Sequence, residues 1–348
     1  MRKLRIGIIG HFGGPKKFND GQTIKTLTIY RALKEAGFEQ TEAIDTYYIR
    51  KSPFRFIRVF VAGLLHDQKI IILLSYKGRR VLFPILYWLA RYMKKEIYHY
   101  SIGGRLASEV KRKRHWKKYI SAFKGNWVES HALEKELGEL GVKNAVYIPN
   151  FKRLNSLAEQ NLQYAHTEPY KFCLFSRVMA EKGVEDAITA ICDVNRSAGR
   201  QIAVLDIYGM IEPAYSERLR EILQNTNDCN YCGVVPAEES VETLKGYFAL
   251  LFPTHWRHEG IPGTIIDALS AGIPVIARKW QYCDEMIEDG YTGLVYDFDK
   301  PKLLKEKILT AIENSSQMFE MKKHCLQKAK EYSENRVIKQ ILKEMGVD

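Results

Sequence analysis

The stretch from Phe252 to Ala277, FPTHWRHEGIPGTIIDALSAGIPVIA, most constrains the fold of this 348-residue chain. Its pattern predicts the end of one strand, a glycine-rich loop, a helix, a tight turn and a second strand. Strands that alternate with helices in this way form parallel sheets. The stretch therefore predicts an α/β protein.

The same alternation extends over both halves of the chain. In the first half, strands are predicted at residues 4–10, 42–49, 69–74, 96–101, 126–129 and 144–148, with helices near 21–36, 78–93, 105–122 and 130–140. In the second half, strands are predicted at 171–176, 202–208, 229–234, 248–253, 274–277 and 293–296. Polar residues at 150–169 mark the linker, and residues 318–345 have helical periodicity without strands.

The loop within the first stretch combines groups that suit a sugar nucleotide. Glycine lets a ligand approach the backbone closely, and the free N–H groups of a helix start favour a phosphate. Carboxylates accept hydrogen bonds only, which suits them to sugar hydroxyls. The structural alternative is a connection whose acids only cap the helix start. The predicted binding residues are Glu259, Gly260, Ile261, Pro262, Gly263 and Thr264, with Asp267 about one turn inside the helix.

Two cations follow the strand predicted at 171–176. Arg177 and Lys182 are expected at the carboxyl end of that strand, where open α/β sheets bind ligands. Two cations that converge on a diphosphate would offset the charge of a leaving group. The alternative is a solvated arginine and an ordinary lysine at a helix start.

At these residues the chain resembles glycosyltransferase family 4, the retaining enzymes of GT-B fold, and its bacterial cell-surface polysaccharide type. The family's E-x7-E and A-x-x-x-G-x-P-V-I-A patterns stand here as Glu259-x7-Asp267 and as residues 268–277. The resemblance implies that Glu259 contacts the donor sugar, that Asp267 contacts the ribose, and that Arg177 and Lys182 hold the diphosphate. Asp267 is one methylene group shorter than the glutamate usual in the family.

The resemblance also implies an architecture: two Rossmann-like parallel-sheet domains that face a central cleft. We expect an acceptor-binding domain over residues 1–160 and a nucleotide-sugar-binding domain over residues 161–330. The terminal helix, residues 331–348, is expected to cross back and pack on the first domain.

Further site residues follow from the resemblance. The loop GHFGGPKKFNDGQT at 10–23 is expected to face the donor phosphates and the acceptor, although its glycines lack the dinucleotide-fingerprint spacing. His99 either contacts the donor or acceptor or simply packs in a tyrosine-rich strand. The base and ribose are expected on backbone groups of two later strand ends. These assignments cover Gly13, Gly14, Gly21, His99, Gly103, Gly104, Tyr208, Gly209, Gly233 and Val234.

The function implied is that of a hexosyltransferase which moves a sugar, with retention, from an NDP-sugar to a hydroxyl acceptor. UDP or GDP is the expected nucleotide, and a lipid-linked or growing surface polysaccharide is the expected acceptor. No DxD-type metal motif lies in a suitable loop, so catalysis without a metal or another cofactor is expected. The alternatives are a sugar-nucleotide 2-epimerase of the same fold, a nucleotide-binding pseudoenzyme and a protein that binds an anionic surface.

Positive charge is concentrated in the first half of the chain. Residues 1–150 hold 29 Lys and Arg against 12 Asp and Glu, a net charge of +17, whereas the remainder carries −5. The runs KSPFRFIRVFVAGLL (51–65) and KRKRHWKK (111–118) suit an anionic membrane surface, although the second run could equally be a solvated helix face. We expect no nucleic-acid partner, because no recognition-module signature is present.

The apolar runs and the cysteines of the sequence bear on where the protein is located. The longest apolar runs, at 57–65, 70–74 and 81–90, are shorter than the roughly 20 residues needed to span a bilayer. No signal peptide is recognised, and the six cysteines lack metal spacing apart from Cys229-x-x-Cys232, which we interpret as a reduced pair. Cytoplasmic localisation, with peripheral attachment to the cytoplasmic face of the membrane, is therefore expected.

Overall fold

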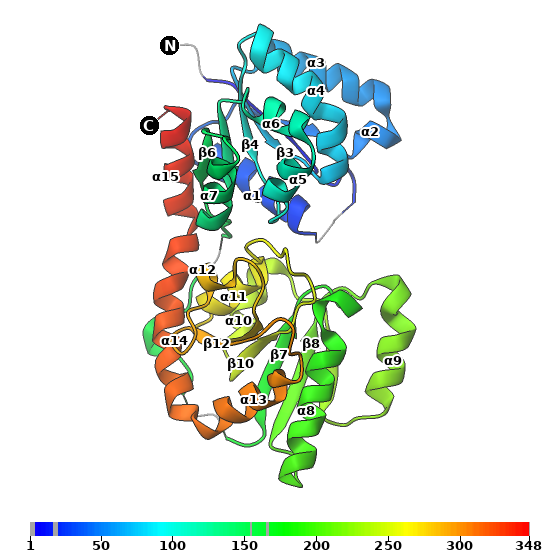
Figure 1. Ribbon diagram of the computed structural model, residues 1–348, viewed down its shortest axis with the longest axis vertical. Coiled ribbons are helices and arrows are strands. Elements are labelled where there is room, and N and C mark those ends of the chain that lie inside the picture. Colours follow the sequence, from blue (N-terminus) through cyan, green and yellow to red (C-terminus); the bar gives the residue numbers. More distant parts are fainter. Residues whose placement is uncertain (1–3, 17–19, 154, 165–166, 348) are drawn as a thin grey trace. The chain divides into compact units, whose positions relative to one another are not determined.

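The computed structural model of the chain describes residues 4–16, 20–153, 155–164 and 167–347. Its contacts divide the chain into two compact units: unit 1 is Met1–Lys152 with Glu334–Asp348, and unit 2 is Arg153–Ser333. Each unit contains a six-stranded sheet with helices packed against it (Figure 1).

The sheet of unit 1 has the strand order β2-β1-β3-β4-β5-β6, with every neighbouring pair parallel. Its strands are β1 (Ile6–Gly10), β2 (Thr41–Asp45), β3 (Lys69–Leu73), β4 (Glu96–Tyr100), β5 (Gly125–Val128) and β6 (Ala145–Tyr147). Its helices are α1 (Gly21–Glu35), α2 (Tyr48–Lys51), α3 (Pro53–His66), α4 (Tyr76–Tyr92), α5 (Leu106–Arg112), α6 (Arg114–Ile120), α7 (His131–Glu139) and α15 (Glu334–Met345). Helices on both faces explain why the central strands are continuous apolar runs.

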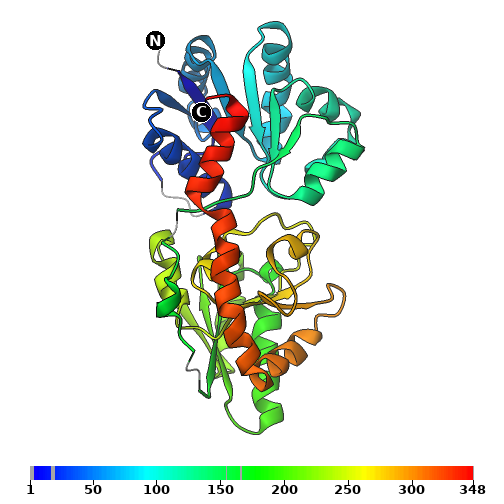
Figure 2. The ribbon, with the colours of Figure 1, turned by 90° about the vertical axis from the view of Figure 1, so that its left-hand side faces the viewer.

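The last helix of the chain, α15, belongs to unit 1 although it follows unit 2 in sequence. Its apolar side chains Val337 and Ile341 are completely buried in one core with Ile8 of β1 and Ile29 of α1. Figures 1 and 2 both draw α15, in red, against unit 1. The sequence of unit 1 is therefore discontinuous.

The sheet of unit 2 has the strand order β12-β11-β10-β7-β8-β9 and is also parallel throughout. Its strands are β7 (Tyr170–Phe175), β8 (Ala203–Tyr208), β9 (Cys229–Gly233), β10 (Ala249–Phe252), β11 (Val275–Arg278) and β12 (Gly293–Tyr296). Its helices are α8 (Val184–Ala198), α9 (Ser216–Gln224), α10 (Ser240–Leu244), α11 (Gly263–Ser270), α12 (Cys283–Met286), α13 (Leu303–Glu313) and α14 (Ser315–Ala329). The order reverses between β7 and β10, which is where open sheets of this kind bind ligands.

All twelve predicted strands are present, and most of the differences concern helices of unit 1. The strand predicted at 42–49 ends at Asp45, and the chain then turns into α2. The helix predicted at 105–122 is broken at Lys113 into α5 and α6. Helix α3 was not predicted, because its aliphatic and aromatic run lacks a single apolar stripe. None of the helices in the described part of the chain is long and apolar enough to cross a membrane.

Candidate active site

The candidate active site of unit 2 lies where the strand order reverses. Strands β7 and β10 are parallel neighbours there, and they lead into helices α8 and α11. The connection after β7 carries Arg177 and Lys182, and the connection after β10 carries Glu259. Two segments about 77 residues apart in the chain are thereby placed at one edge of the sheet.

Lys182 and Glu259 form an ion pair at this edge. The ammonium nitrogen of Lys182 lies 2.6 Å from Oε1 of Glu259, and the two side chains are only 10% and 12% exposed. The ammonium group also lies 4.4 Å from the centre of the Trp256 ring, within cation–π range. The second carboxylate oxygen of Glu259, Oε2, is buried without a hydrogen-bond partner among the described residues. A buried carboxylate oxygen without a donor is costly, and a ligand hydroxyl would satisfy it.

Gly183 allows the two segments to approach each other. Its φ is +73°, a backbone conformation that glycine adopts readily. A Cβ at this position would lie 2.0 Å from the carbonyl oxygen of Pro253, so no larger residue fits. The N–H of His255 also donates to the carbonyl of Glu181 at 2.8 Å. These contacts hold the turn of Lys182 against the loop of Glu259.

The start of α11 offers backbone donors, as the sequence predicts. Pro262 precedes the helix, and no side chain caps its first turn. The hydroxyl of Thr264 donates to the carbonyl of Phe175 at the end of β7. The Thr264 hydroxyl, a predicted binding group, therefore joins α11 to β7. Gly260 and Gly263 are half-buried, and Ile261 is buried in the loop.

Asp267, for which a ribose contact was predicted, is buried within the packing of α11. Its side chain is only 1% exposed, and Oδ1 accepts a hydrogen bond from the Ser240 hydroxyl at 3.0 Å. The aspartate therefore connects α11 to the start of α10.

Arg177 and the ends of β8 and β9 adjoin this site. Arg177 is exposed and forms no ion pair with the described residues. A Cβ on Gly209 would lie 1.8 Å from the carbonyl oxygen of Ser176, so the ends of β7 and β8 are in close contact. The N–H of Gly209 donates to the carbonyl of Gly233 at 2.8 Å, and Val234 is exposed. The hydroxyl of Tyr208 lies 2.7 Å from that of Tyr247.

The predicted residues of the first half lie in unit 1. Gly13 and Gly14 have φ values of +92° and +57°, and the carboxylate of Asp45 accepts the Gly14 N–H at 2.8 Å. Gly21 is the first residue of α1, and residues 17–19 of this loop lie outside the described residues. Gly103 has a φ of +74° with open space beside it, whereas Gly104 is buried.

His99 is packed in the core of unit 1. Its side chain is completely buried, and its ring meets Phe83 edge-on. Burial, together with the positive charge of Arg79, lowers the pKa of His99 to about 3. The imidazole therefore remains neutral at physiological pH. This burial favours the alternative of a packed histidine in a tyrosine-rich strand.

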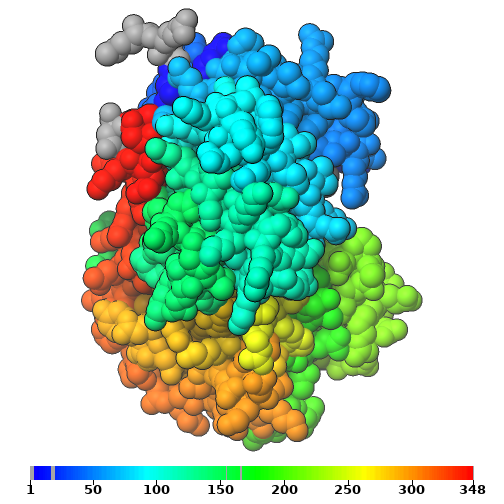
Figure 3. Space-filling model, turned by 45° about the horizontal axis from the view of Figure 1, so that its top comes forward, coloured from blue at the N-terminus to red at the C-terminus, as the bar shows by residue number. Residues whose placement is uncertain are grey.

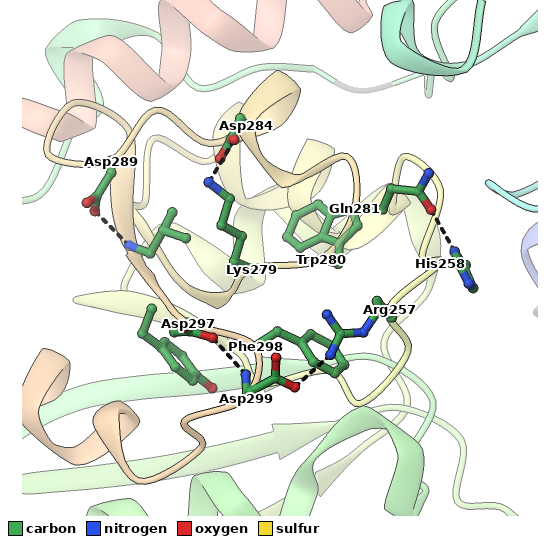
Figure 4. Close-up of a pocket in the computed structure, with 12 residues that line it drawn as sticks. Arg257, His258, Lys279, Trp280, Gln281, Asp284, Asp289, Asp297, Phe298 and Asp299 are labelled. Carbon is green, nitrogen blue, oxygen red and sulfur yellow. Dashed lines mark hydrogen bonds and ion pairs between the residues drawn. The ribbon is translucent and has the colours of Figure 1, made fainter. Parts of the chain in front are cut away.

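A cavity beside the Glu259 loop was not predicted from the sequence. Its volume is about 710 Å³, and Figure 4 shows Arg257 paired with Asp299 and Lys279 paired with Asp284. The indole N–H of Trp280 donates to the carbonyl of Gly260 at 3.1 Å. These residues brace the loop that carries Glu259. They come from three connections far apart in sequence, so no local motif identifies them.

The site contains no group of side chains that suits a metal ion. Among the residues that the structure describes, no three His, Cys, Asp or Glu side chains are grouped so that they could hold one. The connections at the reversal point carry two cations, one carboxylate and the start of a helix. This combination can bind a phosphate group beside a hydroxyl-bearing ring.

Comparisons with known proteins agree with this geometry. An uncharacterized glycosyltransferase of Methanocaldococcus jannaschii is 22% identical over 295 residues, which cover 75% of this chain and 70% of that protein. The N,N'-diacetylbacillosaminyl-diphospho-undecaprenol alpha-1,3-N-acetylgalactosaminyltransferase of Campylobacter jejuni is 27% identical over 119 residues, 34% of this chain and 31% of that protein. The crystal structure of Anabaena HepE in complex with UDP and glucose superposes with a TM-score of 0.72 at 13% identity over 99% of both chains.

The fold and the family follow from these matches. The two parallel six-stranded sheets of this chain match the HepE structure over 99% of its length. This arrangement is the GT-B fold. The family profile described as glycosyl transferases group 1 matches residues 158–332, half of the chain and nearly all of unit 2. The chain is therefore a glycosyltransferase and belongs to the glycosyl transferases group 1 family.

Proposed function

We propose that this glycosyltransferase transfers a hexose, with retention of configuration, from a UDP- or GDP-sugar to a hydroxyl of a lipid-linked or growing polysaccharide. The observation that carries the proposal is the largely buried Lys182–Glu259 pair, with side chains 10% and 12% exposed, at the strand-order reversal of unit 2. One oxygen of Glu259 has no donor among the described residues. A sugar hydroxyl would supply that donor.

The diphosphate of the donor is assigned to the cationic side of the site. Arg177 is exposed and unpaired among the described residues, and Lys182 is held about nine-tenths buried against Trp256. The first turn of α11 adds backbone N–H groups that no side chain caps. Cations and helix dipoles aimed at a leaving group stabilise the charge that develops there. We propose that these groups serve in place of a metal ion.

The reaction breaks the bond between the sugar's anomeric carbon and the diphosphate oxygen, and the electron pair leaves with the diphosphate. The acceptor oxygen bonds to the anomeric carbon on the same face, and its proton goes to a diphosphate oxygen. Glu259 would hold the sugar and stabilise its developing positive charge. The base and ribose are assigned to the backbone of Tyr208, Gly209, Gly233 and Val234.

The acceptor assignment draws on the relatives. The Campylobacter jejuni relative is named for a diphospho-undecaprenol acceptor, and a Staphylococcus aureus relative is named as a capsular polysaccharide biosynthesis glycosyltransferase. The basic first half of this chain, with its net charge of +17, suits an anionic acceptor or surface. We therefore propose a lipid-borne or polymeric saccharide acceptor and action at the cytoplasmic face of a membrane.

Two experiments in sequence test the proposal. A thermal-shift panel of UDP, GDP, ADP, CMP and dTDP with their common sugar adducts identifies the donor, because a ligand of the folded state raises the melting temperature. The donor found is then incubated with lipid extract and with oligosaccharides, and NMR reports the anomeric configuration of the product. Transfer with retained configuration, unchanged by EDTA, supports the proposal. Inverted product, or an epimerised donor formed without acceptor, contradicts it.

A further inference from the structure

The face of unit 1 formed by α3 and α4 exposes an unusual amount of apolar surface. Ten of the fifteen large apolar side chains that the described residues expose lie between residues 54 and 93. The most exposed are Phe54 at 89%, Leu65 at 65% and Tyr92 at 65%. Single exposed apolar residues are ordinary on a soluble protein, but a contiguous group of this size indicates an interaction surface.

On α3, four of these side chains form one stripe. Phe54, Ile57, Val61 and Leu65 are spaced by three, four and four residues, so they align along one side of the helix. The opposite side is also apolar, because Phe56, Phe60 and Leu64 are buried against the unit. One apolar side of α3 therefore packs on the core of unit 1, and the other apolar side remains available for a second apolar environment.

On α4, a second stripe has the same form. Val81, Ile85, Trp88 and Tyr92 are spaced by four, three and four residues, and all are exposed. Leu82, Phe83, Leu86 and Leu89 face the core instead. Helix α3 lies in the connection from β2 to β3, and α4 lies in the next connection, from β3 to β4. Figures 1 and 3 show the two helices adjoining. The two stripes therefore belong to one surface, which we call the α3–α4 face.

The charges around the α3–α4 face are almost all positive. Neither helix contains an acidic residue, and residues 46–128 hold nineteen Lys and Arg against three acids, Asp67, Glu96 and Glu109. Asp67 and Glu109 are buried, and Glu96 pairs with Lys69. Exposed basic side chains flank the stripes, among them Arg55, Arg58, Lys77, Arg80 and Arg91.

Helix α6 extends this basic border. It packs beside α4, where the ammonium of Lys118 lies 5.2 Å from the centre of the Tyr87 ring. Arg114, Lys117 and Lys118 are exposed on it. Within the basic run at 111–118, the side chain of Trp116 is 2% exposed and stacks on Tyr76. The run therefore supplies charge, and the apolar contact comes from α3 and α4.

We propose that the α3–α4 face binds the surface of an anionic lipid bilayer, with the two apolar stripes lying at the acyl boundary and the surrounding Arg and Lys side chains contacting lipid phosphates. Exposed apolar stripes on helices that contain no acidic residue and have a basic border are typical of a membrane interface. A protein partner would normally present a mixture of charges, whereas this face complements one sign only. This inference rests on the proposed function in one respect: a lipid-borne acceptor would bring the enzyme to a membrane.

Vesicle flotation without any sugar substrate tests the proposal. The wild type should float with vesicles of phosphatidylcholine and phosphatidylglycerol but not with phosphatidylcholine alone, and salt should weaken binding through screening. Arg58→Glu with Arg91→Glu should weaken binding roughly 25-fold or more, since each basic group near such a surface contributes about fivefold. The matched control is Lys135→Glu with Lys143→Glu, exposed lysines elsewhere in unit 1 that change net charge equally.

The apolar contribution is tested separately. Phe54→Gln with Leu65→Gln, and Val81→Gln with Trp88→Gln, should each lower partitioning roughly tenfold or more without lowering the melting temperature. Trp88 is 54% exposed, so its fluorescence, taken as wild type minus Trp88→Phe, should shift to the blue on anionic vesicles. A lysine-control loss equal to that of the arginine pair, or no vesicle binding by the wild type, overturns the proposal. A dimer in solution that the glutamine variants dissociate overturns it in favour of a second copy. None of these three results would affect donor binding by unit 2, which is measured without membranes.

Discussion

The ammonium of Lys182 lies 2.6 Å from one carboxylate oxygen of Glu259, and the other oxygen of Glu259 has no partner among the described residues. The pair connects the loop after β7 to the loop after β10 at the strand-order reversal of unit 2. A cation with a half-satisfied carboxylate suits a ligand that carries phosphate at one end and hydroxyls at the other.

Gly183→Ala should disrupt this relationship. An added Cβ would lie 2.0 Å from the carbonyl oxygen of Pro253, at a φ of +73°. Gly199→Ala is the matched control, because Gly199 has a φ of +66° with nothing within 4 Å of its Cβ position. The left-handed conformation alone costs about 1–2 kcal/mol, so Gly183→Ala should lower the free energy of unfolding by clearly more than Gly199→Ala and should also weaken nucleotide-sugar binding. Equal losses measured by urea denaturation would contradict the close contact.

Asp267 should act in stability rather than in donor binding. Its carboxylate accepts the hydroxyl of buried Ser240 at 3.0 Å, and loss of such a bond costs about 1–3 kcal/mol. Asp267→Ala should therefore lower the free energy of unfolding, and the double variant with Ser240→Ala should be non-additive. Nucleotide affinity should change little in variants that remain folded. A large loss of nucleotide affinity at unchanged stability would instead indicate a ribose contact.

Asp67 should make the stability of unit 1 depend on pH. Burial, and then the negative charge of Glu42, raise the pKa of this carboxyl from 3.8 to about 7. Both of its oxygens are buried without hydrogen-bond partners among the described residues. Between about pH 4 and pH 7 the folded state holds a proton that the unfolded state has released. The stability contribution is therefore full at low pH and is lost as pH rises, by about 1.4 kcal/mol per pH unit.

The variant Asp67→Asn tests this pH dependence. Its amide does not ionise, so the melting temperature of the variant relative to wild type should rise from pH 5 to pH 8. Asp193→Asn, at a half-buried residue paired with Arg196, is the control and should show no such trend. A constant difference across that range would contradict the raised pKa of Asp67.

The central strands β1, β3, β10 and β11 were predictable because each is a short, mainly apolar run, which is the pattern of strands buried on both faces. Helix α3 was not predictable in the same way. Phe54 and Leu65 are exposed although Phe56 and Leu64 are buried, so the helix has no polar side and shows no single stripe. The first domain was expected to end at residue 160, whereas the first segment of unit 1 ends at Lys152. The polar stretch at 150–169 contains no residue pattern that marks this position.

The site was predictable to the extent that its residues share a motif. Lys182 and Glu259 follow the ends of two strands that the fold brings together. Their positions after these strands were therefore sufficient to predict that both belong to the site. The burial of Asp267 and His99 depends on packing by residues far away in sequence, Ser240 and Phe83. The Trp280 hydrogen bond to the Gly260 carbonyl likewise joins separate connections, and no spacing rule marks it.

The most direct test of the central claim is calorimetric titration with paired ligands: UDP against UDP-glucose, and GDP against GDP-mannose. Wild type should bind one nucleotide, and its sugar adduct more tightly. Lys182→Met should weaken both ligands of that pair, whereas Glu259→Gln should weaken only the sugar adduct, each by roughly 10- to 100-fold for a charged hydrogen bond. The controls Lys302→Met and Glu306→Gln, on or beside α13, should leave binding unchanged. Equal affinity of Glu259→Gln and wild type for the sugar adduct, with both proteins folded, would contradict the claim that this pair holds the donor.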